Sequence, residues 1–271
     1  RLSQEFSAYS SAFSRDFVRI NDSFQALRSI NIGATAVGTG LNADEDYRHL
    51  AVSTLSDISG IDVISSADLV DGTRNVDPFV WAHSALNTFA TSLSKMCSDF
   101  RLMASGPKAG FGEIRLPEMQ PGSSIMPGKL EVTNQVCFQV FGNQVTITKA
   151  AEAGQLELNV FEPVLFYNLL QSIEILTNVC ETLRVNCIDG IEANRERCEE
   201  LVEISTATAT AIAPHIGYKK ASLFAKQAMK ENKRLRQLIV ESEVLSVEEL
   251  DEILNLEKMT NPGIPGLRHK K

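Results

Sequence analysis

The residues best suited to chemistry lie in one short stretch, Gly122-Ser123-Ser124-Ile125-Met126-Pro127-Gly128-Lys129. Two adjacent hydroxyls stand between two glycines, whose backbones adopt conformations that other residues resist. A cation, Lys129, follows a few residues after Ser123. Such a segment can close over an anionic ligand and bring a hydroxyl to a reacting carbon. Gly, Ser and Pro are also the usual residues of surface turns, so composition alone does not separate a catalytic loop from a turn.

Long helices are predicted to carry this stretch. Apolar residues recur every three or four positions in four segments, which is the spacing of a buried helix face, at about residues 2–30, 80–103, 131–141 and 164–186. Between Val164 and Cys180 the only charged residue is Glu174. A helix that is apolar on nearly every side is buried on nearly every side. We therefore expect this helix at the centre of an assembly, in contact with neighbouring subunits.

The remaining sequence, from about Ile191, is predicted to form shorter and more charged helices. Ser246 and Glu249 have the spacing of a capping box, with a helix expected from there to about Leu256. Strand signals are sparse, and 61–65 is the best short candidate. The predicted fold class is all-α, with a long-helix bundle over residues 1–190 that carries the Gly-Ser stretch and a small helical domain over residues 191–271.

Composition narrows the function classes. The net charge of −8 argues against general nucleic-acid binding, which normally requires a basic face. No uncharged apolar run of about 18 residues predicts a membrane span. The cysteine count is odd and the spacings are not those of metal ligands, which favours reduced thiols and a cytoplasmic enzyme. The histidines are scattered as well, with His215 the best candidate for a structural role. We expect neither a metal nor a cofactor.

Several segments together resemble the aspartase/fumarase superfamily of lyases. Besides the Gly-Ser stretch, which is similar to the signature loop of these enzymes, three segments match in the same order: 33–42, 102–107 and 151–160. The resemblance covers essentially the whole chain. It implies a long-helix bundle of the aspartase/fumarase type, incomplete here at its N-terminus, so that the chain is the C-terminal portion of a longer enzyme. It also implies a homotetramer with composite active sites.

The resemblance also implies roles for the residues of the loop. Ser123 is the base, acting as an alkoxide that removes a proton next to a carboxylate, and Lys129 binds a substrate carboxylate. Backbone N–H groups and a nearby ammonium would favour the serine anion. Substrate binding extends to Ser124, Ile125 and Met126, with supporting positions at Gly122, Gly128 and Glu131. The family associates a glutamate at the last position with a histidine of an upstream Thr-His pair.

Within the superfamily, two segments favour the aspartate ammonia-lyases over the fumarases. These are 134–138 and 155–163, where fumarases usually have Phe in place of Leu156 and Lys in place of Glu162. The expected reaction is therefore elimination of ammonia from L-aspartate to give fumarate, through an aci-carboxylate. A class II fumarase that interconverts fumarate and L-malate is the alternative. A non-catalytic helical assembly fragment is the third interpretation.

One departure from the family pattern follows the loop. The family continues from the lysine through an Asn that contacts substrate before it reaches the glutamate, whereas here Lys129-Leu130 leads directly to Glu131. Either these residues are deleted or the sequence omits a mobile segment, and we favour the second interpretation. A true deletion would put closure of the loop and activity in question.

Overall fold

The computed structural model describes residues 1–106, 108–117 and 130–267. It divides into two compact units. The bundle unit comprises Leu2–Leu102 and Leu116–Ile191, and the C-terminal unit comprises Arg1, Met103–Arg115 and Glu192–Lys271. Helices dominate both units and the strands contain two residues each, which confirms the predicted all-α class.

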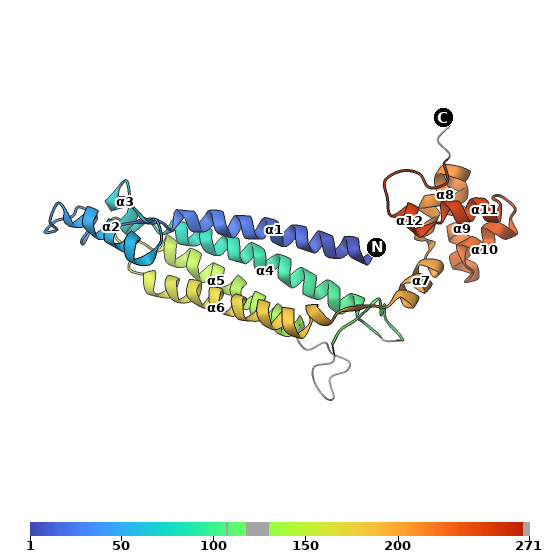
Figure 1. Cartoon of the computed structure of the whole chain (residues 1–271), viewed down its shortest axis with the longest axis horizontal. Coiled ribbons are helices and arrows are strands. Elements are labelled where there is room, and N and C mark those ends of the chain that lie inside the picture. The colour runs from blue at the N-terminus through green and yellow to red at the C-terminus, as the bar shows by residue number, and fades with distance from the viewer. Residues whose placement is uncertain (107, 118–129, 268–271) are drawn as a thin grey trace. The chain divides into compact units, whose positions relative to one another are not determined.

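The bundle unit is built on four long helices that run alongside one another (Figure 1). They are α1 (Leu2–Ala26), α4 (Asp77–Met103), α5 (Leu130–Glu152) and α6 (Glu162–Asn186). Ring contacts pair Phe6 with Phe100 and Phe13 with Phe89, at centroid separations of 5.3 and 5.8 Å, so α1 and α4 are antiparallel. Each fully buried Leu, Ile or Phe contributes about 1.5–3 kcal/mol of transfer free energy. The largest fully buried apolar side chains of this core are Phe100, Leu130, Ile147, Leu165 and Val140.

Two boundaries of these helices differ from the sequence-based expectation. The first helix ends at Ala26 rather than near residue 30, because Ser29–Ile30 forms β1 and pairs in parallel with β2 (Ile64–Ser65). The third helix continues to Glu152 instead of ending near residue 141. Polar residues interrupt its apolar repeat beyond that point, and the structure satisfies them with buried hydrogen bonds. The predicted strand at 61–65 is confirmed at its last two residues.

A smaller group of elements connects α1 to α4. It contains β1, α2 (Tyr47–Ser59), β2 and α3 (Leu69–Arg74). The Gly-rich segment 33–42 lies in this group, and Gly38 has a φ of +85°. A Cβ at Gly38 would lie 2.3 Å from the Cα of Val70, so only glycine fits this close approach of two backbones.

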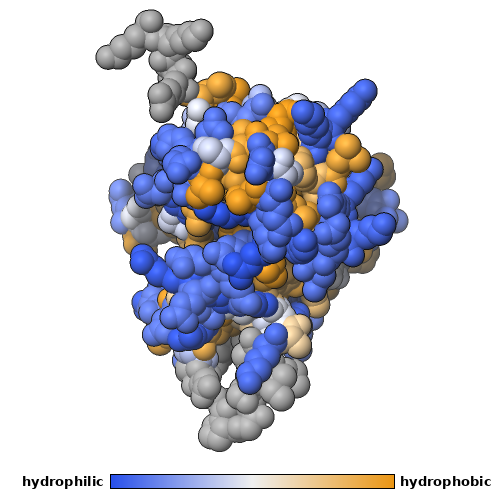
Figure 2. Space-filling view, turned by 90° about the vertical axis from the view of Figure 1, so that its right-hand side faces the viewer, coloured by the Kyte–Doolittle hydropathy of each residue, from blue (hydrophilic) through white to orange (hydrophobic). Residues whose placement is uncertain are grey.

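The C-terminal unit packs short helices around its own apolar core. After β3 (Ile114–Arg115) and β4 (Glu192–Ala193) come α7 (Arg195–Ile204), α8 (Ala209–Ile216), α9 (Tyr218–Glu231), α10 (Leu235–Glu241), α11 (Val247–Ile253) and α12 (Leu256–Met259). Short 3-10 turns are Ile188–Gly190, in the bundle unit, and Thr206–Thr208. The buried core residues are Ile212, Ala228, Leu235, Leu238, Ile239, Leu250 and Ile253. Viewed from the right-hand side of Figure 1, the surface is mostly hydrophilic with apolar residues gathered in places (Figure 2).

Polar caps define the helices at the end of this unit. The predicted capping box is confirmed, because Ser246 Oγ accepts from the backbone N–H of Glu249 and the Glu249 carboxylate accepts from that of Ser246. The helix ends at Ile253, short of the expected Leu256, because Asn255 caps a separate turn. The structural role expected for His215 is also confirmed, since its Nε2 lies 2.7 Å from the Pro265 carbonyl.

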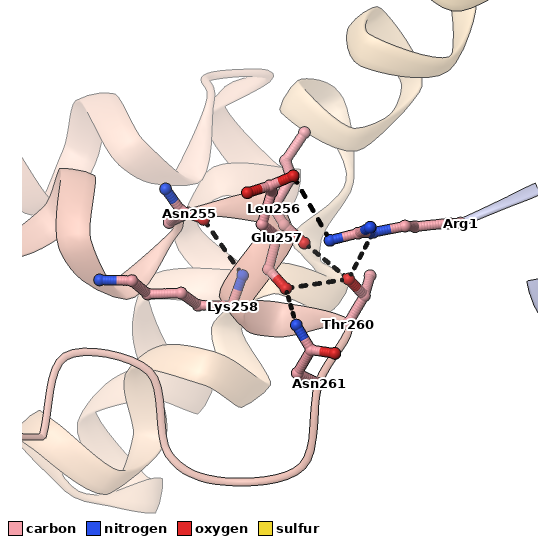
Figure 3. A network of polar contacts seen from close by, with 7 residues as sticks. All are labelled: Arg1, Asn255, Leu256, Glu257, Lys258, Thr260 and Asn261. Carbon is pink, nitrogen blue, oxygen red and sulfur yellow. Dashed lines mark hydrogen bonds and ion pairs between the residues drawn. The ribbon is translucent and has the colours of Figure 1, made fainter.

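Arg1 belongs to a polar network on α12 (Figure 3). Its Nε donates to Thr260 Oγ1 at 3.0 Å, and its guanidinium lies 3.6 Å from the Glu257 carboxylate. The Thr260 hydroxyl contacts the carbonyls of Leu256 and Glu257. Both charged side chains are substantially exposed, so this ion pair contributes little to stability.

A buried polar cluster joins three helices of the bundle. His83 of α4 is fully buried, with Nδ1 2.7 Å from Gln144 Oε1 on α5 and Nε2 2.8 Å from Ser172 Oγ on α6. Because an amide oxygen only accepts, Nδ1 carries the proton and Nε2 accepts from the serine hydroxyl. Asn143 Nδ2 donates to the same hydroxyl at 2.9 Å. Burial lowers the pKa of His83 below its ordinary value, against the opposing effect of the Gln144 hydrogen bond.

The depressed pKa of His83 predicts acid sensitivity of the fold. Between the unfolded pKa of about 6.5 and the lower folded pKa, only the unfolded state binds the proton, so stability falls as the pH falls. Between pH 7.5 and 5.5, the free energy of unfolding of the unaltered protein should therefore fall more than that of His83→Gln. The additional loss should be up to about 1.4 kcal/mol. Denaturant titrations of both proteins at the two pH values measure this difference. Equal pH dependence in the two proteins would contradict the assignment.

Candidate active site

The loop residues predicted to carry the chemistry lie outside the described residues. These are Gly122, Ser123, Ser124, Ile125, Met126, Gly128 and Lys129. Their roles stay predictions from the resemblance. The structure does describe the chain on both sides of this stretch, together with Glu131, the remaining predicted site residue.

Before the loop, the chain is held by a backbone ladder within the C-terminal unit. β3 pairs with β4 in antiparallel register, with Ile114 opposite Ala193 and Arg115 opposite Glu192. The side chain of Asn194 donates to the Gly112 carbonyl at 3.0 Å, and its backbone N–H donates to the Glu113 carbonyl at 2.9 Å. These bonds fix the course of the backbone up to residue 115.

Arg197 of α7 holds the turn that precedes β3. Its Nε donates to the Phe111 carbonyl at 2.9 Å, and an Nη donates to the Gly110 carbonyl at 3.0 Å. A Cβ at Gly110 would lie 2.5 Å from the Ser105 carbonyl, so a side chain does not fit there. Arg197 could not be identified from the sequence, because an arginine in a charged helix has no local signature of a contact with a distant backbone carbonyl.

After the loop, the chain enters α5 at the buried residue Leu130. Glu131 lies in the first turn of this helix, where the helix dipole favours a negative charge. Its Oε1 lies 2.9 Å from Nε of Arg101 on α4. Its Oε2 is buried and has no hydrogen-bond partner among the residues described. The predicted supporting residue thus has one carboxylate oxygen paired and one oxygen free to accept.

Asn134, one turn further along α5, also has one hydrogen-bonded polar atom and one unpaired polar atom. Its Nδ2 donates to the backbone carbonyl of Ser94 at 3.0 Å and to the Ser94 hydroxyl at 2.8 Å. Its Oδ1 is buried without a hydrogen-bond partner in the described part of the chain. In the sequence, Asn134 stands out only as part of the segment 134–138 that resembles the aspartate ammonia-lyases.

Three of the cysteines are poor candidates for a nucleophile because they are buried. All of them are free, and the thiols of Cys97, Cys137 and Cys187 are buried. Burial raises the pKa of Cys97 to about 12, that of Cys137 to about 12 and that of Cys187 to about 11. Because the thiolate is the reactive form, these groups are inert near neutral pH.

Neither a metal-binding cluster nor a membrane-spanning helix is present among the described residues. Within residues 1–106, 108–117 and 130–267, no group of His, Cys, Asp and Glu side chains is arranged to hold a metal ion. In that same part of the chain, no helix has both the length and the apolar character needed to cross a membrane.

Comparison with known proteins places the chain in a family. A family model described as Lyase matches residues 1–142, and one described as Fumarase C C-terminus matches residues 209–261. The chain belongs to this lyase family, within the aspartase/fumarase superfamily.

Three of the curated relatives are described as aspartate ammonia-lyases. An aspartate ammonia-lyase of Bacillus sp is 52% identical over 98% of this chain and 58% of its own length. That of Bacillus subtilis is 51% identical over 98% of the chain and 57% of its own length. The enzyme of Escherichia coli K12 is 42% identical over 99% and 57%, respectively. The chain therefore spans somewhat more than half the length of these relatives.

Solved structures share the fold. A fumarate lyase:delta crystallin from Brucella melitensis superposes with a TM-score of 0.90, at 42% identity, over 96% of this chain and 58% of that one. A class II fumarase from Schistosoma mansoni gives a TM-score of 0.89 at 31% identity, over 95% and 59%. These likenesses confirm the predicted long-helix bundle of the aspartase/fumarase type.

Proposed function

We propose that the protein containing this chain is an aspartate ammonia-lyase, which eliminates ammonia from L-aspartate to give fumarate. The proposal is supported by sequence identity to known enzymes. The chain is 52% identical to an aspartate ammonia-lyase over nearly its whole length, but 31% identical to the class II fumarase. Leu156 and Glu162 also favour the aspartate ammonia-lyases, because fumarases usually have Phe and Lys at these positions.

The chemistry requires a base at carbon and positive potential at a carboxylate. The proton next to a carboxylate is weakly acidic because its removal gives a doubly negative aci-carboxylate. Ser123 as alkoxide takes this proton, while Lys129 and backbone N–H groups stabilise the charge that develops on the carboxylate oxygens. Collapse of the aci-carboxylate forms the carbon–carbon double bond and breaks the carbon–nitrogen bond. The amine then leaves as ammonia with the bonding electron pair.

A single assay separates the competing functions. Full-length protein is supplied with L-aspartate and, separately, with L-malate, and fumarate is followed by its absorbance. An aspartate ammonia-lyase forms fumarate from L-aspartate alone. Formation from L-malate alone would establish the fumarase alternative, and no formation from either would favour a non-catalytic assembly protein.

Replacing the proposed base should nearly abolish turnover. In the full-length enzyme, Ser123→Ala removes the group that accepts the proton, and general-base catalysis is typically worth 10²–10⁴-fold. We expect kcat to fall by at least about 100-fold with the oligomer intact. Ser11→Ala, on an exposed face of α1, is the matched control. Retention of about a tenth of the turnover by Ser123→Ala would show that another group is the base.

Replacing the proposed carboxylate ligand should affect both binding and turnover. Lys129→Ala removes a charge that interacts with the substrate and more strongly with the aci-carboxylate. A charged hydrogen bond contributes about 1.5–3 kcal/mol, so kcat/KM should fall roughly 10–100-fold. Lys149→Ala, which removes an exposed lysine of α5 paired with Glu152, should leave the kinetics unchanged. Normal kinetics in Lys129→Ala would remove this residue from the site.

The proposal includes a homotetramer whose active sites combine residues of different subunits. Large apolar side chains stay exposed on the bundle helices of a single chain: Val164, Tyr167 and Leu170 on α6, with Phe138 and Val145 on α5. Several large apolar side chains exposed on the same two helices support burial against other subunits. Analytical ultracentrifugation of the full-length protein should give a tetramer at micromolar concentration. A stable monomer would contradict both the tetramer and the shared sites.

A further inference from the structure

Two polar side chains at the start of α5, Glu131 and Asn134, are each bonded to α4 through one atom and have a second, unpaired oxygen. Arg101 pairs with Glu131 Oε1, and Asn134 Nδ2 donates to the Ser94 carbonyl and hydroxyl and, at 3.5 Å, to Ser98 Oγ. The oxygens left over, Glu131 Oε2 and Asn134 Oδ1, are buried without a hydrogen-bond partner among the described residues. Residues three apart in a helix lie on the same face, so both acceptors belong to one face of the start of α5.

Buried acceptors of this kind require donors. Leaving a buried polar oxygen without a hydrogen bond is costly, and the cost is greater for a carboxylate. Folded proteins therefore pair nearly all such groups. Both unpaired atoms can only accept, so the group that meets them must carry N–H or O–H donors. It lies outside the described residues of this chain.

We propose that Arg101 is a positioning residue of the active site: it holds Glu131 Oε1 and thereby aims Oε2 at a hydrogen-bond donor of the assembled enzyme. The proposal rests on the lyase function above, because Glu131 lies in the first turn of the helix that follows the predicted catalytic stretch. A glutamate has three rotatable side-chain bonds, and its side chain here is 28% exposed, so an unpaired carboxylate could turn toward water. The planar, permanently charged guanidinium limits that freedom.

A purely structural ion pair would behave differently. The Arg101 side chain is 47% exposed, and exposed pairs contribute little to stability. A pair that only links α4 to α5 would change the melting temperature slightly and leave catalysis intact. A positioning pair leaves stability nearly intact but changes turnover, because a displacement of about 1 Å can cost on the order of 100-fold in rate.

The test is a double-mutant cycle in the full-length enzyme. It compares Arg101→Gln, Glu131→Gln and the double variant by kcat and KM for L-aspartate, melting temperature and oligomeric state. Arg184→Gln is the matched control, because it removes an arginine from ion pairs with Glu181 and Asp189 on the same bundle unit.

A positioning role gives a specific pattern in this cycle. We expect Arg101→Gln to lower kcat on the order of 100-fold with little change in KM. Arg101→Lys should recover part of the loss, since it restores the charge without the planar fork. In the Glu131→Gln background, Arg101→Gln should reduce kcat by no more than about twofold, because the side chain it positions is already altered.

Two outcomes overturn the proposal. One is a kcat of Arg101→Gln within about twofold of the unaltered enzyme, and the other is full multiplication of the two single losses in the double variant. Should Arg101→Gln fail to fold, the cycle of Arg101→Lys with Glu131→Gln decides between the same outcomes. An unaltered enzyme that forms no fumarate overturns the proposed function itself. An active unaltered enzyme with a fully active Arg101→Gln overturns only the positioning role.

Discussion

The hydrogen-bonded cluster around His83 sets the relative positions of three helices in the bundle unit. Apolar contacts alone permit helices to slide, since one leucine packs almost as well as its neighbour. Directional bonds from His83 to Gln144 and Ser172 do not permit this, because a shift of one turn would leave several buried polar groups unpaired. The cost of that loss selects one register of α4 against α5 and α6. The first residue of α5, Leu130, is positioned by the same register.

The contact between α4 and α5 has two polar regions that differ in how completely their hydrogen bonds are satisfied. Around His83 the described groups satisfy one another, with Asn143 bonded to Ser172 and Gln144 bonded to Ser84. This closed arrangement favours a neutral imidazole and suits a rigid interior. At the start of α5 the hydrogen bonding is incomplete, because Glu131 and Asn134 each have one buried acceptor oxygen without a partner among the described residues. The same helix therefore combines a fully hydrogen-bonded polar core with two buried acceptors that have no partner among the described residues.

Periodicity in the sequence predicted the long helices because each presents a nearly continuous apolar face. It failed in the second half of α5, where Asn143 and Gln144 interrupt the repeat and their burial depends on partners on α4 and α6. The contact of Arg101 with Glu131 was also beyond sequence analysis, because neither residue has a local pattern that indicates its partner. The roles predicted for Ser123 and Lys129 follow from the family resemblance, since the spacing and composition of the residues alone do not assign them. Polar contacts between distant segments depend on tertiary packing, which the sequence expresses only indirectly.

The predicted catalytic stretch is bounded by two different kinds of support. On its N-terminal side, the described chain is fixed through backbone groups, by the pairing of β3 with β4 and by Arg197 on the preceding turn. On its C-terminal side, the chain is fixed through side chains, by the burial of Leu130 and by the ion pair of Glu131. Backbone pairing depends weakly on residue type, whereas the second support depends on particular side chains. Substitutions at the start of α5 and at its α4 partners should therefore affect function more selectively than substitutions in β3.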